Sequence, residues 1–202
     1  MTTQGHRLGP EFYTRTDTLQ VGRDLLGCTL HSCIDGEHCA GLITEVEAYL
    51  GVNDRASHAF GARRTARTEI MFGPGGRAYV YLCYGIHHLF NVVTHQEGTP
   101  HAILIRGIRP VLGQETMWMR RGTKGTCRTD GPGTAAQALG IKTVHTGMVL
   151  QGPELWITND EVNIPASHLL AGPRIGVDYA GEDAALPYRF RISPELIRSW
   201  RA

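Results

Sequence analysis

The distribution of hydrophobic and polar positions along the chain predicts a sheet of several strands. Runs rich in Val, Ile, Leu and Tyr, most of them separated by Gly or polar turns, are typical of strands. Four such runs cover residues 42–50, 78–84, 89–94 and 102–108. We expect these runs to form a central mixed or antiparallel sheet.

Short helices are predicted on either side of these runs. Residues 17–26 have Asp17 as a candidate N-cap and end before Gly27. Residues 114–121 and 134–139 are helical in pattern, the second with Thr134 as a candidate cap and Gly140 as its stop, and Ser193-Pro194-Glu195 opens a C-terminal helix. Because Gly and Pro are frequent in between, we expect one compact, loop-rich α+β domain over residues 1–202, with 1–10 as a flexible N-terminal segment.

Length and composition agree with a globular domain. The 202 residues are 42% apolar and 19% charged, which supplies a sizeable core and argues against a disordered chain. No apolar run approaches the ~18 residues of a membrane span, and the N-terminus is polar, unlike a signal peptide. We therefore expect a cytoplasmic protein without a membrane partner. Five cysteines without a Cys-x-x-Cys pair are expected to be reduced thiols.

Charge is unevenly distributed although the net charge is only +1. Residues 1–54 carry a net charge of −5, residues 55–128 carry +8 and residues 129–202 carry −2. Eighteen of the twenty basic residues are Arg, whose planar guanidinium matches phosphate oxygens better than an ammonium does. The middle third therefore indicates a polyanionic partner, with a solvated basic face as the alternative.

A pair of carboxylates is the first candidate for chemistry. Strand alternation places Glu45, Glu47 and Tyr49 on one face of the 42–50 run. A carboxylate at the end of a half-buried strand can serve as a general base, because burial raises its pKa and the strand fixes its position. A row that merely faces solvent is the alternative.

Aromatic and basic side chains supply the next candidates. The 78–84 run puts Tyr79 and Tyr81 on one face and leaves Tyr84 before Gly85, where we expect an exposed turn. Tyrosines beside a basic block suit a protein that grips phosphates and stacks on bases, whereas packing in the core is the alternative. Arg106 interrupts an apolar strand, so it should face a carboxylate, a water-filled site or a phosphate.

Metal and nucleotide motifs are not found in the sequence. His58, His87 and His88 lack metal-site spacing, since neighbouring residues of a strand point to opposite faces. Residues 72–76 are typical of a turn, because Pro74 removes a donor and no Lys-Ser/Thr follows. We expect neither a metal nor an organic cofactor.

Blocks of residues spread over most of the chain match one known family in order and spacing. The main blocks are Glu45-Val46-Glu47-Ala48-Tyr49-Leu50-Gly51, Ser57-His58, Arg67-Thr68-Glu69-Ile70-Met71-Phe72-Gly73-Pro74-Gly75, Ala78-Tyr79-Val80-Tyr81-Leu82-Cys83-Tyr84-Gly85, Asn91-Val92-Val93, Ile103-Leu104-Ile105-Arg106 and Arg174-Ile175-Gly176. From about residue 12 to residue 192, the chain closely resembles the alkyladenine (3-methyladenine) DNA glycosylase family.

This resemblance implies a monofunctional DNA N-glycosylase of base-excision repair. Such an enzyme flips alkylated or otherwise damaged purines, of the 3-methyladenine, hypoxanthine or ethenoadenine type, out of duplex DNA. It then hydrolyses the N-glycosidic bond and leaves an abasic site. The resemblance implies that Glu47 is the general base that activates water and that Arg106 helps to hold this water.

The resemblance also implies how the damaged base is held. Tyr49 and His58 correspond to opposite walls of a base pocket, with Tyr81 beside them. Asn91 corresponds to the residue that screens the purine edge, and Tyr84 to the residue that intercalates where the nucleotide has left. The implied partner is double-stranded DNA containing damaged purines, bound by a monomer that would associate with the nucleoid in a bacterium.

Some positions depart from the family pattern, and two other functions stay open. Arg109, Thr134 and the pair His87-His88 replace residues of different chemistry, and Tyr188 stands where the family tends to have Trp. We expect these departures to affect DNA affinity and lesion preference rather than the class of activity. The alternatives are a non-catalytic DNA damage-binding protein and a hydrolase of free nucleosides that uses the same carboxylate.

Overall fold

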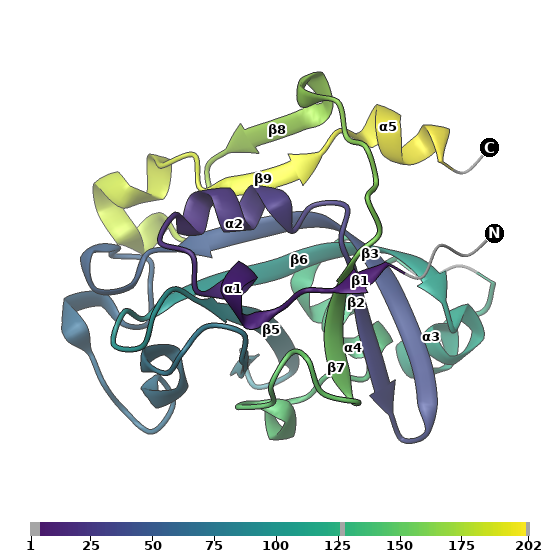
Figure 1. The fold of residues 1–202 in the computed structure, drawn as a ribbon, viewed down its shortest axis with the longest axis horizontal. Coiled ribbons are helices and arrows are strands. Elements are labelled where there is room, and N and C mark those ends of the chain that lie inside the picture. The colour runs from purple at the N-terminus through teal and green to yellow at the C-terminus, as the bar shows by residue number, and fades with distance from the viewer. Residues whose placement is uncertain (1–4, 126–127, 201–202) are drawn as a thin grey trace.

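One antiparallel sheet forms the frame of the molecule (Figure 1). The computed structural model describes residues 5–125 and 128–200, and nine strands of this part of the chain belong to the sheet. The strands are β1 (His6–Arg7), β2 (Thr29–Ile34), β3 (Glu37–Tyr49), β4 (Ala78–Cys83), β5 (His87–Thr94), β6 (His101–Leu112), β7 (Leu155–Asn159), β8 (Leu169–Gly172) and β9 (Arg189–Ile192). Their order is β1-β7-β2-β3-β6-β5-β4, and β9 pairs with both β3 and β8. The predicted α+β class is confirmed, and of the expected mixed or antiparallel pairing the structure shows the antiparallel one.

Short helices connect the strands. The α-helices are α1 (Pro10–Tyr13), α2 (Thr18–Asp24), α3 (Gln114–Arg121), α4 (Pro132–Leu139) and α5 (Pro194–Ser199). The 3₁₀ helices are η1 (Gly51–Asn53), η2 (Phe60–Ala62), η3 (Glu69–Phe72), η4 (Thr143–His145), η5 (Ala166–His168) and η6 (Asp178–Ala185). In Figure 1 the segment that contains η1, η2 and η3 lies at the left-hand end, below η6.

Helix capping follows the sequence at two ends and departs from it at a third. The Asp17 carboxylate accepts a hydrogen bond from the amide of Gln20 (2.9 Å), and Ser193 caps α5. The prediction that Thr134 caps α4 is wrong, because the helix begins at Pro132 with Gly131 as its N-cap. Proline suits the first helical position, and the Thr134 hydroxyl donates back to the Gly131 carbonyl (2.7 Å).

The sheet divides the molecule into a core face and an opposite face. Residues of α2 and α4, such as Val21 and Ala136, share the main hydrophobic core with Val46, Phe90 and Ile103 of the strands. On the opposite face, cross-strand neighbours form a row of Tyr79, Asn91, Leu104 and Glu47 from β4, β5, β6 and β3. Strand alternation thus places this row away from the main core.

The start of the chain packs against the sheet. His6 and Arg7 pair with β7, and Leu8 is buried in the core, within the segment 1–10 that was expected to be flexible. A strand pairing and an apolar contact hold these residues in place. Residues 1–4 lie outside the described part.

Cys28, Cys33, Cys39 and Cys83 are free thiols, and Cys127 lies outside the described residues.

Candidate active site

A cavity of about 380 Å³ opens on the face of the sheet opposite the main core. All seven side chains to which the resemblance gives a role line it, namely Glu47, Tyr49, His58, Tyr81, Tyr84, Asn91 and Arg106. They come from β3, β4, β5, β6, the loop after η1 and the turn between β4 and β5. Glu45, the other candidate carboxylate, is not among the lining residues. The volume lies within the usual range of small-molecule pockets, about 300–1,000 Å³.

Glu47 is wholly buried at this cavity. One carboxylate oxygen, Oε1, accepts a hydrogen bond from the Ile175 amide (2.8 Å), and Oε2 accepts one from the Tyr49 hydroxyl (2.9 Å). Burial raises the pKa of Glu47 above its ordinary value, although the Arg106 guanidinium and these two hydrogen bonds act in the opposite direction. A carboxylate with a raised pKa is a better base near neutral pH than an exposed one.

Arg106 lies between two carboxylates. Its Nε donates to Glu45 Oε1 (2.8 Å), and its Nη1 lies 3.4 Å from Glu47 Oε2. Glu45 Oε1 also accepts a hydrogen bond from Arg189 Nε at 2.8 Å. Of the three surroundings expected for Arg106, a carboxylate, a water-filled site or a phosphate, the structure shows carboxylates. Arg106 also lines the cavity.

Aromatic rings form one wall of the cavity. The His58 ring packs edge-on against Tyr81 (centroids 4.7 Å apart), and its Nδ1 is 2.8 Å from the Tyr79 hydroxyl. Arg67 Nη2 lies 3.3 Å from His58 Nε2, and since a guanidinium can only donate, Nε2 accepts. Burial and the neighbouring arginines lower the pKa of His58 to about 4, so the ring is neutral at pH 7.

Asn91 lies in the cross-strand row and is 3% exposed. Its Nδ2 donates to the carbonyl oxygens of Tyr79 (3.0 Å) and Leu89 (3.3 Å). Both bonds use the amide nitrogen. The amide oxygen is therefore the polar atom of Asn91 that remains for a molecule in the cavity.

Tyr84 stands at the tip of the hairpin between β4 and β5. Its side chain is 91% exposed, and both Tyr84 (φ 50°) and Gly85 (φ 73°) have left-handed backbones. Two consecutive residues with positive φ are the mark of a type I′ hairpin turn, which glycine favours at its second position. The predicted exposed turn is confirmed, and the exposed Leu82 and Ile86 flank it.

A buried ion pair joins two segments that border the site. The side chains of Asp54 and Arg174 are almost fully buried and form a bidentate ion pair. Arg174 Nη2 lies 2.8 Å from Asp54 Oδ1, and Nη1 contacts Oδ2. Asp54 also accepts from the Leu50 and Ala56 amides, and the guanidinium lies 4.9 Å from the Tyr49 ring centroid. The sequence analysis gave this pair no role, although both residues lie in or beside the matching blocks.

Two further cavity residues were not predicted. Ile175, directly after Arg174, supplies the amide that bonds Glu47, and a main-chain donor gives no signal in the side-chain pattern. Tyr179 of η6 is 70% exposed at the cavity, and its hydroxyl donates to the Ala56 carbonyl (3.2 Å). The aromatic character of Tyr179 was the one available signal, but its spacing in the sequence does not connect it with the other tyrosines of the site.

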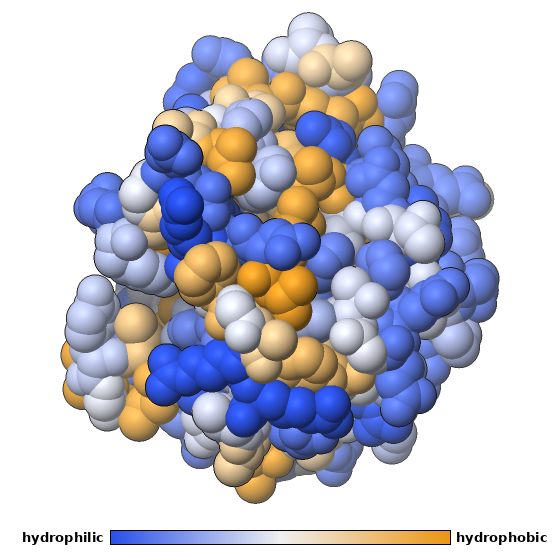
Figure 2. Space-filling view, turned by 90° about the vertical axis from the view of Figure 1, so that its left-hand side faces the viewer, coloured by the Kyte–Doolittle hydropathy of each residue, from blue (hydrophilic) through white to orange (hydrophobic). Residues whose placement is uncertain are grey.

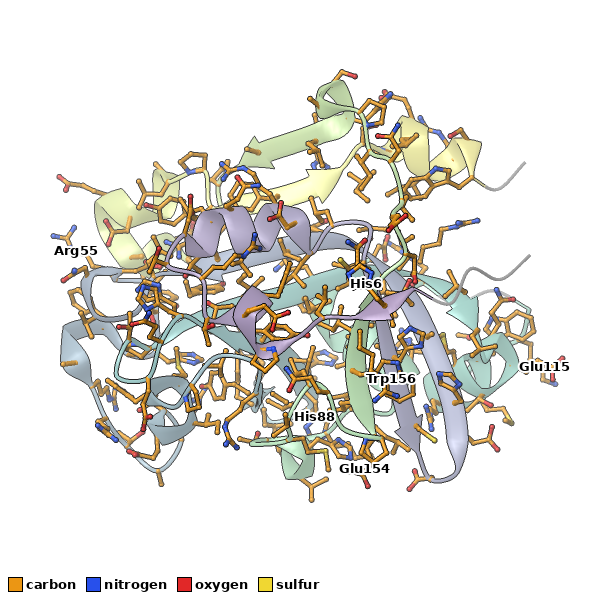
Figure 3. All side chains as sticks on the ribbon, in the orientation of Figure 1. His6, Arg55, His88, Glu115, Glu154 and Trp156 are labelled. Carbon is orange, nitrogen blue, oxygen red and sulfur yellow. The ribbon has the colours of Figure 1, made fainter. Side chains whose placement is uncertain are left out.

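A second hollow of about 390 Å³, which we name the arginine cleft, adjoins the cavity and shares His58, Arg67 and Tyr179 with it. Arg55 and Arg63 also line it. Figure 2 shows the side on which residues 50–72 and η6 lie in Figure 1, and hydrophilic and hydrophobic side chains are mixed there. Arg55 projects outward at the left-hand edge of Figure 3. Its guanidinium Nη1 lies 3.7 Å from Glu182 Oε2.

Within residues 5–125 and 128–200, no three His, Cys, Asp or Glu side chains are grouped so that they could hold a metal ion. In the same ranges, no helix has the length and apolar character needed to cross a membrane.

Comparison with known proteins identifies the family. A family profile described as methylpurine-DNA glycosylase (MPG) matches residues 11–195. A protein of Bacillus mycoides (strain KBAB4) named "Putative 3-methyladenine DNA glycosylase" is 46% identical over 191 residues, which cover 90% of this chain and 93% of its own. A protein of the same name from Bacillus cereus (strain ATCC 10987 / NRS 248) is 45% identical over the same shares. The chain belongs to the methylpurine-DNA glycosylase family.

Proposed function

We propose that this protein excises alkylated or otherwise damaged purines, of the 3-methyladenine, hypoxanthine or ethenoadenine type, from duplex DNA. The observation that carries the proposal is the buried carboxylate of Glu47 beside a cavity with aromatic walls. A base buried in a duplex stack cannot reach such a cavity, so the nucleotide must rotate out of the helix. This rotation costs a few kcal/mol and costs least for damaged or mispaired bases.

Glu47 is the general base of the proposed reaction. It takes a proton from water while the water oxygen forms a bond to the anomeric carbon of the deoxyribose. The N-glycosidic bond breaks, and its electron pair leaves with the purine. The negative charge of the carboxylate and the oxocarbenium character of the sugar attract each other, as in glycoside hydrolysis. A cationic alkylated purine leaves as a neutral base, so one general base suffices for it. A neutral purine such as hypoxanthine leaves as an anion and takes up a proton from water.

Aromatic side chains hold the extruded base in this proposal. Tyr49, Tyr81 and His58 offer rings to a purine, and stacking on a ring face favours a cationic base by roughly 0.5–2 kcal/mol. Because the lowered pKa keeps His58 neutral at pH 7, its ring does not repel a positively charged lesion. Asn91 presents a polar atom to the purine edge, and Tyr84 fills the space that the nucleotide leaves in the duplex.

The arginine cleft is the proposed phosphate-binding surface. It borders the cavity directly, and guanidinium groups bind phosphate oxygens through charge-assisted hydrogen bonds. DNA bound there would enter the cavity with the extruded nucleotide only. We expect the protein to act as a monomer in the cytoplasm, at the nucleoid of a bacterial cell.

Incubation with a duplex that contains one hypoxanthine tests the proposal through detection of the released base. The wild type should release hypoxanthine, and Glu47→Gln should release it about 100- to 10,000-fold more slowly while still binding the duplex. Binding without release by the wild type would indicate a damage-binding protein. Faster cleavage of free inosine than of the duplex would indicate a nucleoside hydrolase.

A further inference from the structure

We propose that Glu45 is a positioning residue of the reaction, which holds Arg106 against Glu47 and does not itself touch the substrate. This inference rests on the proposed function. Strand alternation placed Glu45 on the same face as Glu47, and the resemblance gave a role to Glu47 alone. The contacts of Glu45 in the folded chain give it a role as well.

The hydrogen bonds of Arg106 carry the argument. Only its Nε is held at hydrogen-bond distance in the described part of the chain, and the partner is Glu45 Oε1 at 2.8 Å. The approach of Nη1 to Glu47 is looser, at 3.4 Å, and is an ion pair without a hydrogen bond. The anchor on Glu45 therefore fixes the guanidinium, and the terminal nitrogens remain available to Glu47 and to a water molecule.

Strand geometry shows why this anchor is needed. The register of β3 and β6 shifts on both sides of the Glu45–Gly107 pair. Thr44 is therefore an extra, unpaired residue of β3, and Arg106 is an extra, unpaired residue of β6. A bulged residue loses the regular ladder that would otherwise aim its side chain. The Arg106 side chain is therefore oriented by its hydrogen-bond partner, the carboxylate of Glu45.

Arg189 orients Glu45 from the other side. Its Nε donates to the same Glu45 oxygen at 2.8 Å, so one oxygen atom joins two guanidinium groups. The side chains of Glu45, Arg106 and Arg189 are 17%, 11% and 21% exposed. Limited exposure restricts the alternative positions of these side chains and makes the Glu45 contact effective.

The pH dependence of the excision rate distinguishes positioning from a simple charge effect. Glu47 faces Arg106 of β6, Arg174, Tyr179 of η6, and Glu45 and Tyr49 of its own strand. Loss of the Glu45 charge alone would lower the pKa of Glu47 and move the rising limb of the pH profile to lower pH. Release of Arg106 would raise this pKa and move the limb to higher pH. Since Arg106 influences Glu47 more strongly than Glu45 does, positioning predicts the shift to higher pH.

The experiment is a single-turnover pH profile for release of 3-methyladenine from methylated duplex DNA. We expect Glu45→Gln to lower the plateau rate roughly tenfold to a hundredfold, the cost of misplacing a group by about 1 Å, and to move the limb to higher pH. Glu45→Asp keeps the charge but is too short to hold Arg106 in place, so it should behave in the same way. Glu37→Gln, an exposed residue of the same strand, is the matched control and should match the wild type.

The outcomes separate this inference from the proposed function. If Glu47→Gln is inactive but Glu45→Gln keeps the wild-type rate and limb, or moves the limb to lower pH, the positioning role is overturned and the glycosylase proposal stands. If Glu47→Gln releases base as fast as the wild type, the proposed function itself fails. If Glu45→Gln does not fold, as shown by its circular dichroism, Glu45→Asp decides the question with the same criteria.

Discussion

At the scale of single residues, Glu47 shows how an environment that suits catalysis can oppose stability. Burial raises its pKa, so the folded protein binds the carboxyl proton more tightly than the unfolded chain does. Linkage then requires the free energy of unfolding to fall as the pH rises from the ordinary carboxyl value, about 4.5, through the raised value. Above both values the protein loses this stability in full.

We therefore predict that Glu47→Gln is more stable than the wild type at pH 8, by roughly 0.5–2 kcal/mol. The amide has nearly the same shape and carries no buried charge. Urea unfolding at pH 8 and at pH 4 measures the difference, which should shrink at the lower pH because Glu47 is then protonated. A variant less stable than the wild type at pH 8 would show that the contacts of the carboxylate outweigh its burial.

Tyr84 is the second residue whose surroundings lead to a prediction. Because its side chain is 91% exposed, Tyr84→Ala should leave the fold intact. If the ring fills the gap in the duplex, the variant should lose about 1–3 kcal/mol of stacking and extrude the lesion less often. A fluorescent base analogue reports extrusion. Met119→Ala, at another exposed apolar residue, on α3, is the control. Unchanged extrusion in Tyr84→Ala would contradict the intercalating role.

At the scale of elements, the apolar runs located the strands that face the site. The predicted runs 42–50, 78–84, 89–94 and 102–108 lie in or largely coincide with β3, β4, β5 and β6, because these strands alternate between a core face and a cavity face. Their alternation also placed Glu47 and Tyr49 together, and a hydrogen bond now joins them. Period-2 patterns are reliable where one face is fully buried.

Strands β1, β2, β7, β8 and β9 were not predicted, and β2 shows a physical reason for this. In β2 the buried Ser32 donates to the Leu139 carbonyl (2.7 Å), while His31 and Cys33 point to the other face. A buried hydroxyl with a distant partner breaks the apolar alternation that signals a strand. The bulges at Thr44 and Arg106 are equally hidden, because they depend on how two distant strands pair.

The same limit explains which parts of the site were predicted. The side chains on β3 to β6 follow from alternation and from the resemblance, whereas Tyr179 and the Ile175 amide come from segments that reach the site only through the fold. Asp54 and Arg174 are 120 residues apart, and their pairing joins the loop after β3 to the segment after β8. A contact of this span leaves no local pattern.

This ion pair gives a prediction about the loops that carry the site. Asp54→Asn keeps the shape of the side chain but leaves the buried Arg174 guanidinium without its counterion, which typically costs about 3–5 kcal/mol. Urea unfolding measures the loss. Asp178→Asn, an exposed residue of η6, is the control. A loss below about 1 kcal/mol would mean that the carbonyl contacts of Arg174 hold the loops without the ion pair.

At the scale of the whole molecule, the basic middle third divides into two groups of arginines. Arg64 pairs with Glu69 (2.6 Å), Arg106 with Glu45, and Arg120 donates to the Ile34 carbonyl (2.9 Å). These guanidinium groups have partners within the protein. Arg63 has no carboxylate within ion-pair distance among residues 5–125 and 128–200, and Arg67 contacts only neutral rings and a hydroxyl there. The net charge of +8 therefore overstates the charge that faces DNA.

The salt dependence of duplex binding tests this division. Each neutralised phosphate contributes a slope of about −0.9 to the plot of log affinity against log salt, so Arg63 and Arg67 together predict a slope of roughly −1.8. Arg63→Gln should make the slope less steep by about 0.9 on the same scale. Arg64→Gln is the matched control, because the guanidinium of Arg64 is already bound to Glu69. A flat plot for the wild type, or equal changes in the two variants, would show that the arginine cleft does not bind the DNA backbone.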